Sequence, residues 1–197
     1  MRYNTHLSTA FSVGLPLMLA TDSVGLVPAI GLAIGAVFPD IDESRSYIGR
    51  RLPIISHVIK FLFGHRGIFH SMPFLLLGLF AFYSLVYSFR WSDEWVHWFG
   101  LGYFMHIIMD SFSVSGVPLF KPFYDESIKL GLGKIYYRTG SLFEKSVFFI
   151  TAGFVFILIL KFNLIELFTE DIARWLSLIW QNVKDWRLFL WWILQMK

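Results

Sequence analysis

Uncharged apolar stretches constrain this chain more than any other feature of its sequence, because roughly 17–25 apolar helical residues cross the hydrocarbon core of a bilayer. Five uncharged apolar stretches occur, at residues 7–20, 24–38, 72–89, 95–109 and 146–160. Hydrophobic residues make up 56% of the 197 residues and charged residues only 16%, whereas soluble domains are about 25% charged. We therefore expect an all-α, polytopic membrane protein in which residues 1–197 form a single domain.

The lengths of the last three stretches predict about three full spans. Residues 72–89 are long enough as they stand. Residues 95–109 reach the required length if their helix continues to Phe112, and residues 146–160 do so if Lys161 snorkels and the helix continues to Phe168. Further on, residues 171–196 carry apolar side chains at helical spacing among charged ones, which predicts a helix lying on the membrane interface.

The first two stretches are each too short to span, since about 15 residues rise only ~22 Å. The polar residues 21–23 separate them, and several Gly and Pro residues interrupt both. Two arrangements are open: one kinked span, or a re-entrant helical hairpin packed inside the protein.

Basic residues are concentrated in two segments, 39–67 and 113–145, which hold ten of the 17 Lys and Arg residues. The turn at residues 92–94 between them is acidic, so both basic segments are expected to face the cytoplasm. In a membrane protein the net charge of +3 reflects this topology and contact with anionic headgroups, and we expect no nucleic-acid partner. The absence of cysteine excludes disulfides, thiolate metal sites and Cys nucleophiles.

Most of the His, Asp and Glu residues that could bind a metal or take part in catalysis border the apolar stretches on this same face. They are Asp40, Asp42, His65, His70, His106, Asp110 and Glu144. His106 and Asp110 are spaced i, i+4, so their side chains lie on one helix face and can bind one ion. Imidazole together with carboxylate suits Zn²⁺, Mn²⁺ or Fe²⁺ better than Ca²⁺, which prefers oxygen ligands alone.

His6 favours the hairpin. A single kinked span would place His6 roughly one bilayer away from Asp40, whereas a hairpin returns His6 to the same face and completes the cluster. Structural alternatives are a buried ion pair between His106 and Asp110, a simple helix stop at residues 39–42, and loop packing of the two histidines at 65 and 70. Convergence of all three groups on one face favours a metal site.

Four sequence strings resemble the YdjM-type family of bacterial inner-membrane proteins, which are described as membrane-bound metal-dependent hydrolases. The strings are PDID at 39–42, GHRGIFHS at 64–71, LGYFMHIIMD at 101–110 and SGVPLFKP at 115–122. The resemblance extends from His6 to Glu144. It implies a multi-pass protein of the inner membrane with a metal site, for which the ligand chemistry favours zinc and the number of ligands allows one or two ions. It implies as ligands His6, Asp40, Asp42, His65, His70, His106 and Asp110.

One residue departs from the family pattern. Phe69 stands where we expect a small or polar residue, and it is expected to narrow the pocket. The order of the N-terminal His, the Asp residues and the His-x-x-x-Asp string is also similar to zinc-dependent phospholipase C and related nucleases.

The function expected from these features is metal-dependent hydrolysis of a phosphoester in a lipid or lipid-linked substrate at the cytoplasmic face. Metal-activated water would be the nucleophile. Arg66 would hold the phosphate, and Asp42 or Glu144 would act as general base. The alternatives are a non-catalytic regulator or scaffold with a structural metal, and a metal- or proton-coupled transporter, which needs polar residues at mid-span depth.

Overall fold

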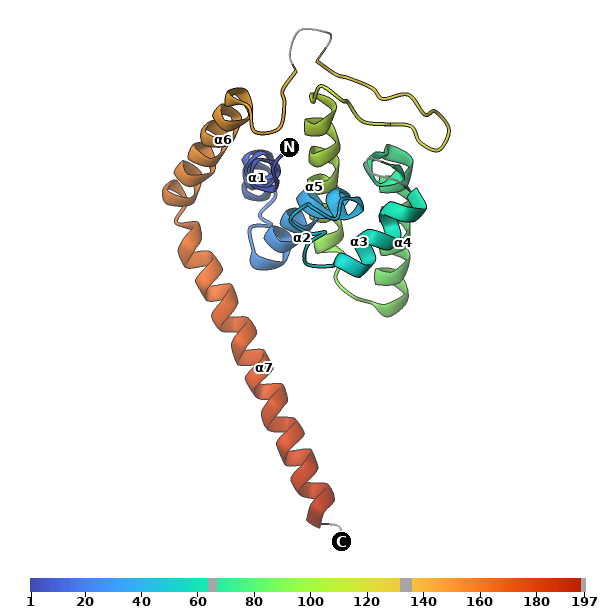
Figure 1. Cartoon of the computed structure of the whole chain (residues 1–197). Helices are drawn as coiled ribbons and strands as arrows, with labels where there is room; N and C mark the ends of the chain where they lie inside the picture. The colour runs from blue at the N-terminus through green and yellow to red at the C-terminus, as the bar shows by residue number, and fades with distance from the viewer. Residues whose placement is uncertain (64–66, 132–135, 196–197) are drawn as a thin grey trace. The chain divides into compact units, whose positions relative to one another are not determined.

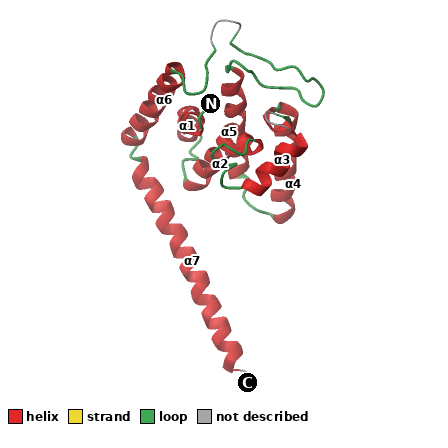
Figure 2. Ribbon diagram, viewed as in Figure 1, coloured by secondary structure: helices red, strands yellow, loops and turns green. Residues whose placement is uncertain are grey.

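The computed structural model describes residues 1–63, 67–131 and 136–195 (Figure 1). All regular elements within these ranges are helices, which confirms the expected all-α class (Figure 2). They are α1 (Tyr3–Ala20), α2 (Leu26–Val37), the 3-10 helix η1 (Phe38–Asp42), α3 (Pro53–Phe63), the 3-10 helix η2 (Ile68–His70), α4 (Met72–Phe89), α5 (Glu94–Ser111), α6 (Leu142–Lys161) and α7 (Leu164–Gln195). The chain divides into two compact units, Met1–Ile157 and Leu158–Lys197.

The N-terminal hairpin is confirmed, and a continuous helix from His6 to Phe38 is excluded. α1 ends at Ala20 and α2 begins at Leu26. The turn between them contains Asp22 in the left-handed region, with φ +52°, which ends the helical path. α1 and α2 pack against each other, and both pack against α5 (Figure 1).

Glycine residues allow α2 and α5 to pack backbone against backbone. A Cβ atom at Gly31 or Gly35 of α2 would collide with the backbone oxygens of Trp95 or Phe99 on α5. Conversely, a Cβ atom at Gly102 of α5 would collide with the backbone of α2. Small residues four apart are a common way to bring two membrane helices close together. α5 is therefore fixed against the last turn of α2.

α5 is also the centre of the apolar core. Phe99, Tyr103 and Ile107 line up along it and pack with Leu75 of α4 and with Val117 of the segment that follows α5. The spacing of four residues places the three α5 side chains on one helix face. The same helix carries His106 and Asp110, so the core fixes the orientation of both.

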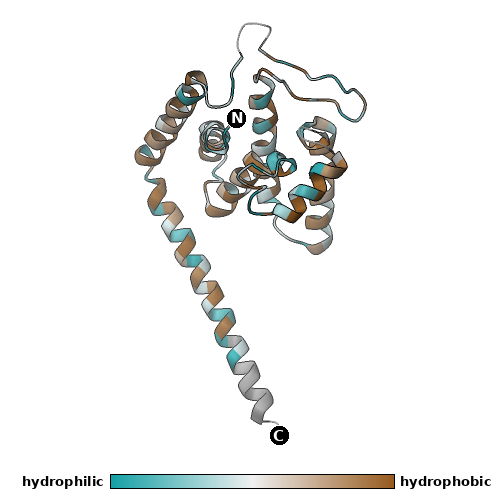
Figure 3. Ribbon diagram, viewed as in Figure 1, coloured by the Kyte–Doolittle hydropathy of each residue, from teal (hydrophilic) through white to brown (hydrophobic). Residues whose placement is uncertain are grey.

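Among the described residues, two helices are long and apolar enough to cross a membrane, α4 with 18 residues and α6 with 20. Only 11% of the residues in each apolar window are buried within the protein, and large side chains such as Leu77 and Phe80 are exposed. Both helices are coloured mainly as hydrophobic in Figure 3. Such a surface suits lipid. α5, the third expected span, has the same length as α4 but is more polar and lies in the core. Its membrane crossing stays a prediction.

The expected extension of the last span to Phe168 is wrong. α6 ends at Lys161, and Asn163 has φ +50°, a left-handed conformation that asparagine tolerates better than most residues. α7 then begins at Leu164, before the predicted start at residue 171, and continues for 32 residues. Apolar and polar residues alternate around α7, in agreement with the expected amphipathic helix (Figure 3). Its contact with a membrane surface stays a prediction.

Candidate metal centre

Five of the expected metal ligands converge from four separate elements. His6 comes from α1, Asp40 from η1, His70 from η2, and His106 and Asp110 from the end of α5. They form two overlapping sets, His6 with His106 and Asp110, and Asp40 with His70 and His106. Within each set the possible ligand atoms all lie within 4.8 Å of one another. The i, i+4 pair on α5 therefore belongs to one set, as the spacing predicts.

His106 has its tautomer fixed by the close packing of α2 on α5. Its Nδ1 lies 2.7 Å from the carbonyl oxygen of Ala36, in the last turn of α2, where helical carbonyls are left for other donors. Because a carbonyl can only accept a hydrogen bond, Nδ1 carries the proton. Nε2 then presents its lone pair to the cluster, and it lies 3.7 Å from Oδ1 of Asp40.

His70 is oriented by the carboxylate of Asp42. Nδ1 of His70 lies 3.2 Å from Oδ2 of Asp42, and both side chains are fully buried. Nε2 of His70 lies 3.7 Å from Oδ1 of Asp40 and 4.0 Å from Oδ2 of Asp110. A carboxylate that binds one imidazole nitrogen while the other nitrogen faces a cation is the usual support for a metal-binding histidine. Asp42 therefore contacts the cluster through His70.

The backbone around His70 is held by three further contacts. The Tyr103 hydroxyl donates to the carbonyl oxygen of Phe69 at 2.5 Å, and the Ser71 side chain caps α4 by accepting from the backbone N–H of Phe74. The Phe69 ring packs 4.4 Å from the Phe74 ring, centroid to centroid. Phe69 is thus part of the aromatic core. Its side chain does not narrow the pocket, contrary to the expectation from sequence.

His6 is the third histidine of the cluster. Its ring stacks on the His106 ring, with centroids 3.7 Å apart and an interplanar angle of 8°. Nε2 of His6 lies 3.4 Å from Oδ1 of Asp110. The same carboxylate accepts hydrogen bonds from the Met1 amino group at 2.7 Å and from the Tyr137 hydroxyl at 2.9 Å. These contacts hold the Asp110 side chain in place.

Several imidazole nitrogens in the cluster have no hydrogen-bond partner among the described residues. They are both ring nitrogens of His6 and the Nε2 atoms of His70 and His106, all buried. A buried polar atom without a partner costs about 1–3 kcal/mol, and native proteins contain few of them. The three Nε2 atoms among them, beside two carboxylates, fit a bound divalent cation, since imidazole and carboxylate are ligands of Zn²⁺, Mn²⁺ and Fe²⁺.

The carboxylates also control protonation of His70. Burial lowers the pKa of the His70 imidazole, but the adjacent Asp40 and Asp42 outweigh burial and raise this pKa to about 9. Burial likewise opposes ionisation of Asp40, yet the neighbouring histidines hold the pKa of this carboxyl well below its usual range. A metal ion would have to displace a proton from His70, so binding should depend on pH.

The cluster opens into a cavity of about 510 Å³. Asp40 and Asp110 contribute to its wall, together with the exposed residues Arg2, Arg45 and Arg50. Asp40 has 20% of its side chain exposed, whereas the three histidines of the cluster have none. A molecule in the cavity can therefore approach the cluster at Asp40. Sequence reasoning treated Arg45 and Arg50 only as topology signals and missed this wall.

The remaining expected site residues are His65, Arg66 and Glu144. His65 and Arg66 lie outside the described residues. Glu144 is buried elsewhere, where it accepts hydrogen bonds from the backbone N–H of Arg2 at 2.5 Å, from that of Gly140, and from the Thr5 hydroxyl. These contacts join the start of α6 to the start of α1, and the expected role of Glu144 as a general base stays a prediction.

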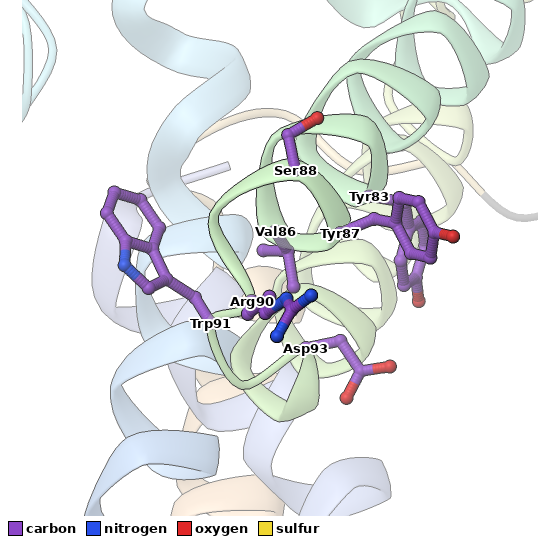
Figure 4. Close-up of a pocket in the computed structure, with 7 residues that line it drawn as sticks. All are labelled: Tyr83, Val86, Tyr87, Ser88, Arg90, Trp91 and Asp93. Carbon is purple, nitrogen blue, oxygen red and sulfur yellow. The ribbon is translucent and has the colours of Figure 1, made fainter.

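A second cavity, of about 740 Å³, lies at the turn between α4 and α5 (Figure 4). The cluster lies at the opposite end of these helices, where α4 begins and α5 ends. Tyr83, Tyr87 and Trp91 line it beside Arg90 and Asp93. Asp93 is the one carboxylate among its described lining residues, and no histidine is present there. This cavity therefore lacks a set of metal ligands.

The fold and the cluster define a helical membrane protein with a candidate metal centre at one end of its helices. A model of the YdjM inner membrane protein family matches residues 1–192, and the chain belongs to this family, which places it in the inner membrane. It is 35% identical over 115 residues to the uncharacterised protein YvsG of Bacillus subtilis, covering 58% of this chain and 67% of YvsG.

It is also 35% identical over 113 residues to the inner membrane protein YdjM of Escherichia coli and to that of Shigella flexneri. Each of these matches covers 54% of this chain, and the chain spans about half (54%) of the length of the YdjM relatives. No solved structure matches the chain.

Proposed function

We propose that the protein is a membrane-embedded, metal-dependent hydrolase that cleaves a phosphoester in a lipid or lipid-linked substrate at the cytoplasmic face. The observation that carries the proposal is the convergence of three imidazole Nε2 atoms, which have no hydrogen-bond partner among the described residues, with Asp40 and Asp110 at the wall of an accessible cavity. Metal ligands that are closed off from solvent suit a structural ion, whereas a cluster that opens into a cavity suits catalysis.

The ligands would be His6, Asp40, His70, His106 and Asp110. Because the single available Nε2 of His106 belongs to both sets, and one imidazole nitrogen binds one ion, we favour one metal ion among these five residues. Zinc, with manganese or iron as alternatives, would supply water activation at neutral pH.

The protein's own side chains would divide the remaining work. Asp42 would act as a positioning residue, because it holds His70 in the tautomer that faces the cluster. Asp40 is the cluster carboxylate most open to the cavity, so it would hold the metal on the side from which a substrate approaches.

The two alternatives have less support. A transporter needs ionisable residues at mid-span depth, whereas α4 contains none and those of α6 lie near its two ends. A scaffold with a structural metal is favoured by a saturated ligand shell closed to solvent, whereas Asp40 is partly exposed to the cavity.

The test is turnover by purified full-length protein on a panel of phospholipids and lipid-linked phosphates. The expected result is release of phosphate or of a phosphorylated headgroup that stops on chelation and returns on addition of zinc. His106→Ala should abolish this activity, while His57→Ala should retain it, because the exposed His57 bonds only to the carbonyl of Pro53 in its own helix among its described contacts. Turnover that survives His106→Ala would reject the proposed mechanism.

A further inference from the structure

We propose that the cavity beside the cluster is an anion-binding subsite that takes the phosphate group of the substrate, held by Arg2, Arg45 and Arg50. The proposal deepens the proposed function and rests on it for its catalytic meaning, because Asp40 and Asp110 of the cluster form part of the same wall. The ligand chemistry is a phosphate group, from a lipid headgroup or from a soluble phosphate ester.

The three guanidinium groups are available to a ligand. Among residues 1–63, 67–131 and 136–195, no ion pair joins the side chain of Arg2, Arg45 or Arg50 to a carboxylate. Glu43, which also lines the cavity, instead pairs with Lys60, with Nζ 3.1 Å from Oε1. Unpaired arginines that share one concave wall concentrate positive charge where an anion can enter.

The loop that carries Arg45 and Arg50 is anchored to the backbone that carries Asp40. The Ser46 hydroxyl donates to the carbonyl oxygen of Asp40 at 2.7 Å and accepts from the backbone N–H of Gly49 at 2.9 Å. A Cβ atom at Gly49 would collide with the backbone of Glu43, so the loop is tightly folded. The loop that carries Arg45 and Arg50 is therefore held in a fixed position relative to Asp40 of the cluster.

A stacked aromatic pair joins this loop to α1. The rings of Tyr3 and Tyr47 lie 4.1 Å apart, centroid to centroid, with an interplanar angle of 18°. Both residues line the cavity, and Arg2 directly precedes Tyr3. The stack thus brings the third guanidinium to the wall formed by the loop.

Phosphate is the anion that best fits this wall. A planar guanidinium donates two parallel hydrogen bonds to phosphate oxygens, and several guanidinium groups can share one tetrahedral anion. Asp40 and Asp110 repel a phosphate placed directly against them, so the phosphate is expected on the arginine side with its ester bond toward the cluster. The subsite therefore orients the bond that the proposed reaction cleaves.

The test measures phosphate binding by calorimetry in the full-length protein, purified in a neutral detergent and titrated with and without bound zinc. The titrants are inorganic phosphate and dihexanoyl phosphatidic acid. The test protein carries Arg45→Gln with Arg50→Gln, both at exposed positions. The matched control carries Lys121→Gln with Lys129→Gln, which removes the same charge from the other basic segment, outside the described lining of the cavity.

We expect the arginine variant to bind inorganic phosphate at least about tenfold more weakly than the wild type, while the lysine variant keeps wild-type affinity. Tighter Arg-dependent binding of phosphatidic acid than of phosphate would identify a lipid headgroup as the source. Equal binding would identify a soluble phosphate. Unchanged affinity in the arginine variant, or no binding of either titrant by the wild type, would overturn the subsite.

The outcomes also separate this inference from the proposed hydrolase. Arg-dependent phosphate binding in a protein without turnover would support the subsite while the hydrolase fails. Wild-type turnover in the arginine variant, with zinc still bound, would reject the subsite and leave the hydrolase standing.

Discussion

Asp42→Asn tests how the cluster is supported. In the wild type the Asp42 carboxylate lies 3.2 Å from Nδ1 of His70, and both side chains are fully buried. Asparagine has nearly the same shape and can still accept a hydrogen bond from Nδ1–H, so the change removes the charge but preserves the packing. The positioning role predicts a weaker but intact metal site.

The size of the effect follows from the type of contact. A hydrogen bond to a charged partner contributes about 1.5–3 kcal/mol, which corresponds to roughly 10–150-fold in affinity. Loss of a carboxylate behind a metal-binding histidine weakens metal affinity by about 10–100-fold. We expect about tenfold for Asp42→Asn, which keeps an acceptor, and about 100-fold for Asp42→Ala, which leaves Nδ1 without that partner.

The assay is competition for zinc between the purified protein and a coloured chelator, with the same zinc stoichiometry expected at saturation for wild type and Asp42→Asn. Glu43→Gln is the matched control, because the neighbouring Glu43 carboxylate pairs with Lys60 and is not among the cluster ligands. Loss of all zinc from Asp42→Asn at saturation would show that Asp42 is itself a ligand. Wild-type affinity in Asp42→Ala would refute the positioning role.

Three further predictions follow. Gly35→Ala should destabilise the protein by about 1–3 kcal/mol and weaken zinc binding in the competition assay. The new methyl group meets the Phe99 backbone and displaces the Ala36 carbonyl from His106. Gly78→Ala should have neither effect, because a Cβ atom there meets nothing within 4 Å. Zinc affinity should fall as the pH is lowered from 9 toward 6, by about tenfold per pH unit for the His70 proton alone. The reason is that His70, whose pKa is about 9, must lose this proton before it can bind zinc. A zinc affinity independent of pH would contradict this. In this cysteine-free chain, Ser127→Cys should resist an impermeant thiol reagent in intact cells, while Ser92→Cys, equally exposed, should react; the reverse pattern would invert the topology.

The hairpin and most of the cluster could be predicted from sequence because they depend on short-range rules. The first two apolar stretches are too short to span a membrane and are separated by the polar residues 21–23, which predicted two helices. Of the two possible arrangements, only the hairpin brings His6 near Asp40, and it was preferred for that reason. The i, i+4 spacing of His106 and Asp110 fixed their common face.

Other features depend on contacts between distant segments and could not be predicted in this way. In the sequence Glu144 borders the same predicted membrane face as the cluster residues. Its hydrogen bonds with the backbone N–H groups of Arg2 and Gly140, which join α6 to α1, are seen only in the folded structure. The break at Asn163 has no Gly or Pro to mark it. The close approach of α2 to α5 did have a signal, because Gly31 and Gly35 are four residues apart, but both were interpreted only as helix interruptions.

Metal content tests the central claim most directly. Full-length protein, purified without chelator and passed over a desalting column, should contain close to one zinc, manganese or iron ion per chain by elemental analysis, a stoichiometry that follows from the overlap of the two ligand sets at His106. A double change of His106→Ala with Asp110→Ala should remove that metal, while the exposed His57→Ala and His97→Ala together should retain it. A folded wild-type protein that contains no transition metal, and takes up none when zinc is added, would contradict the account.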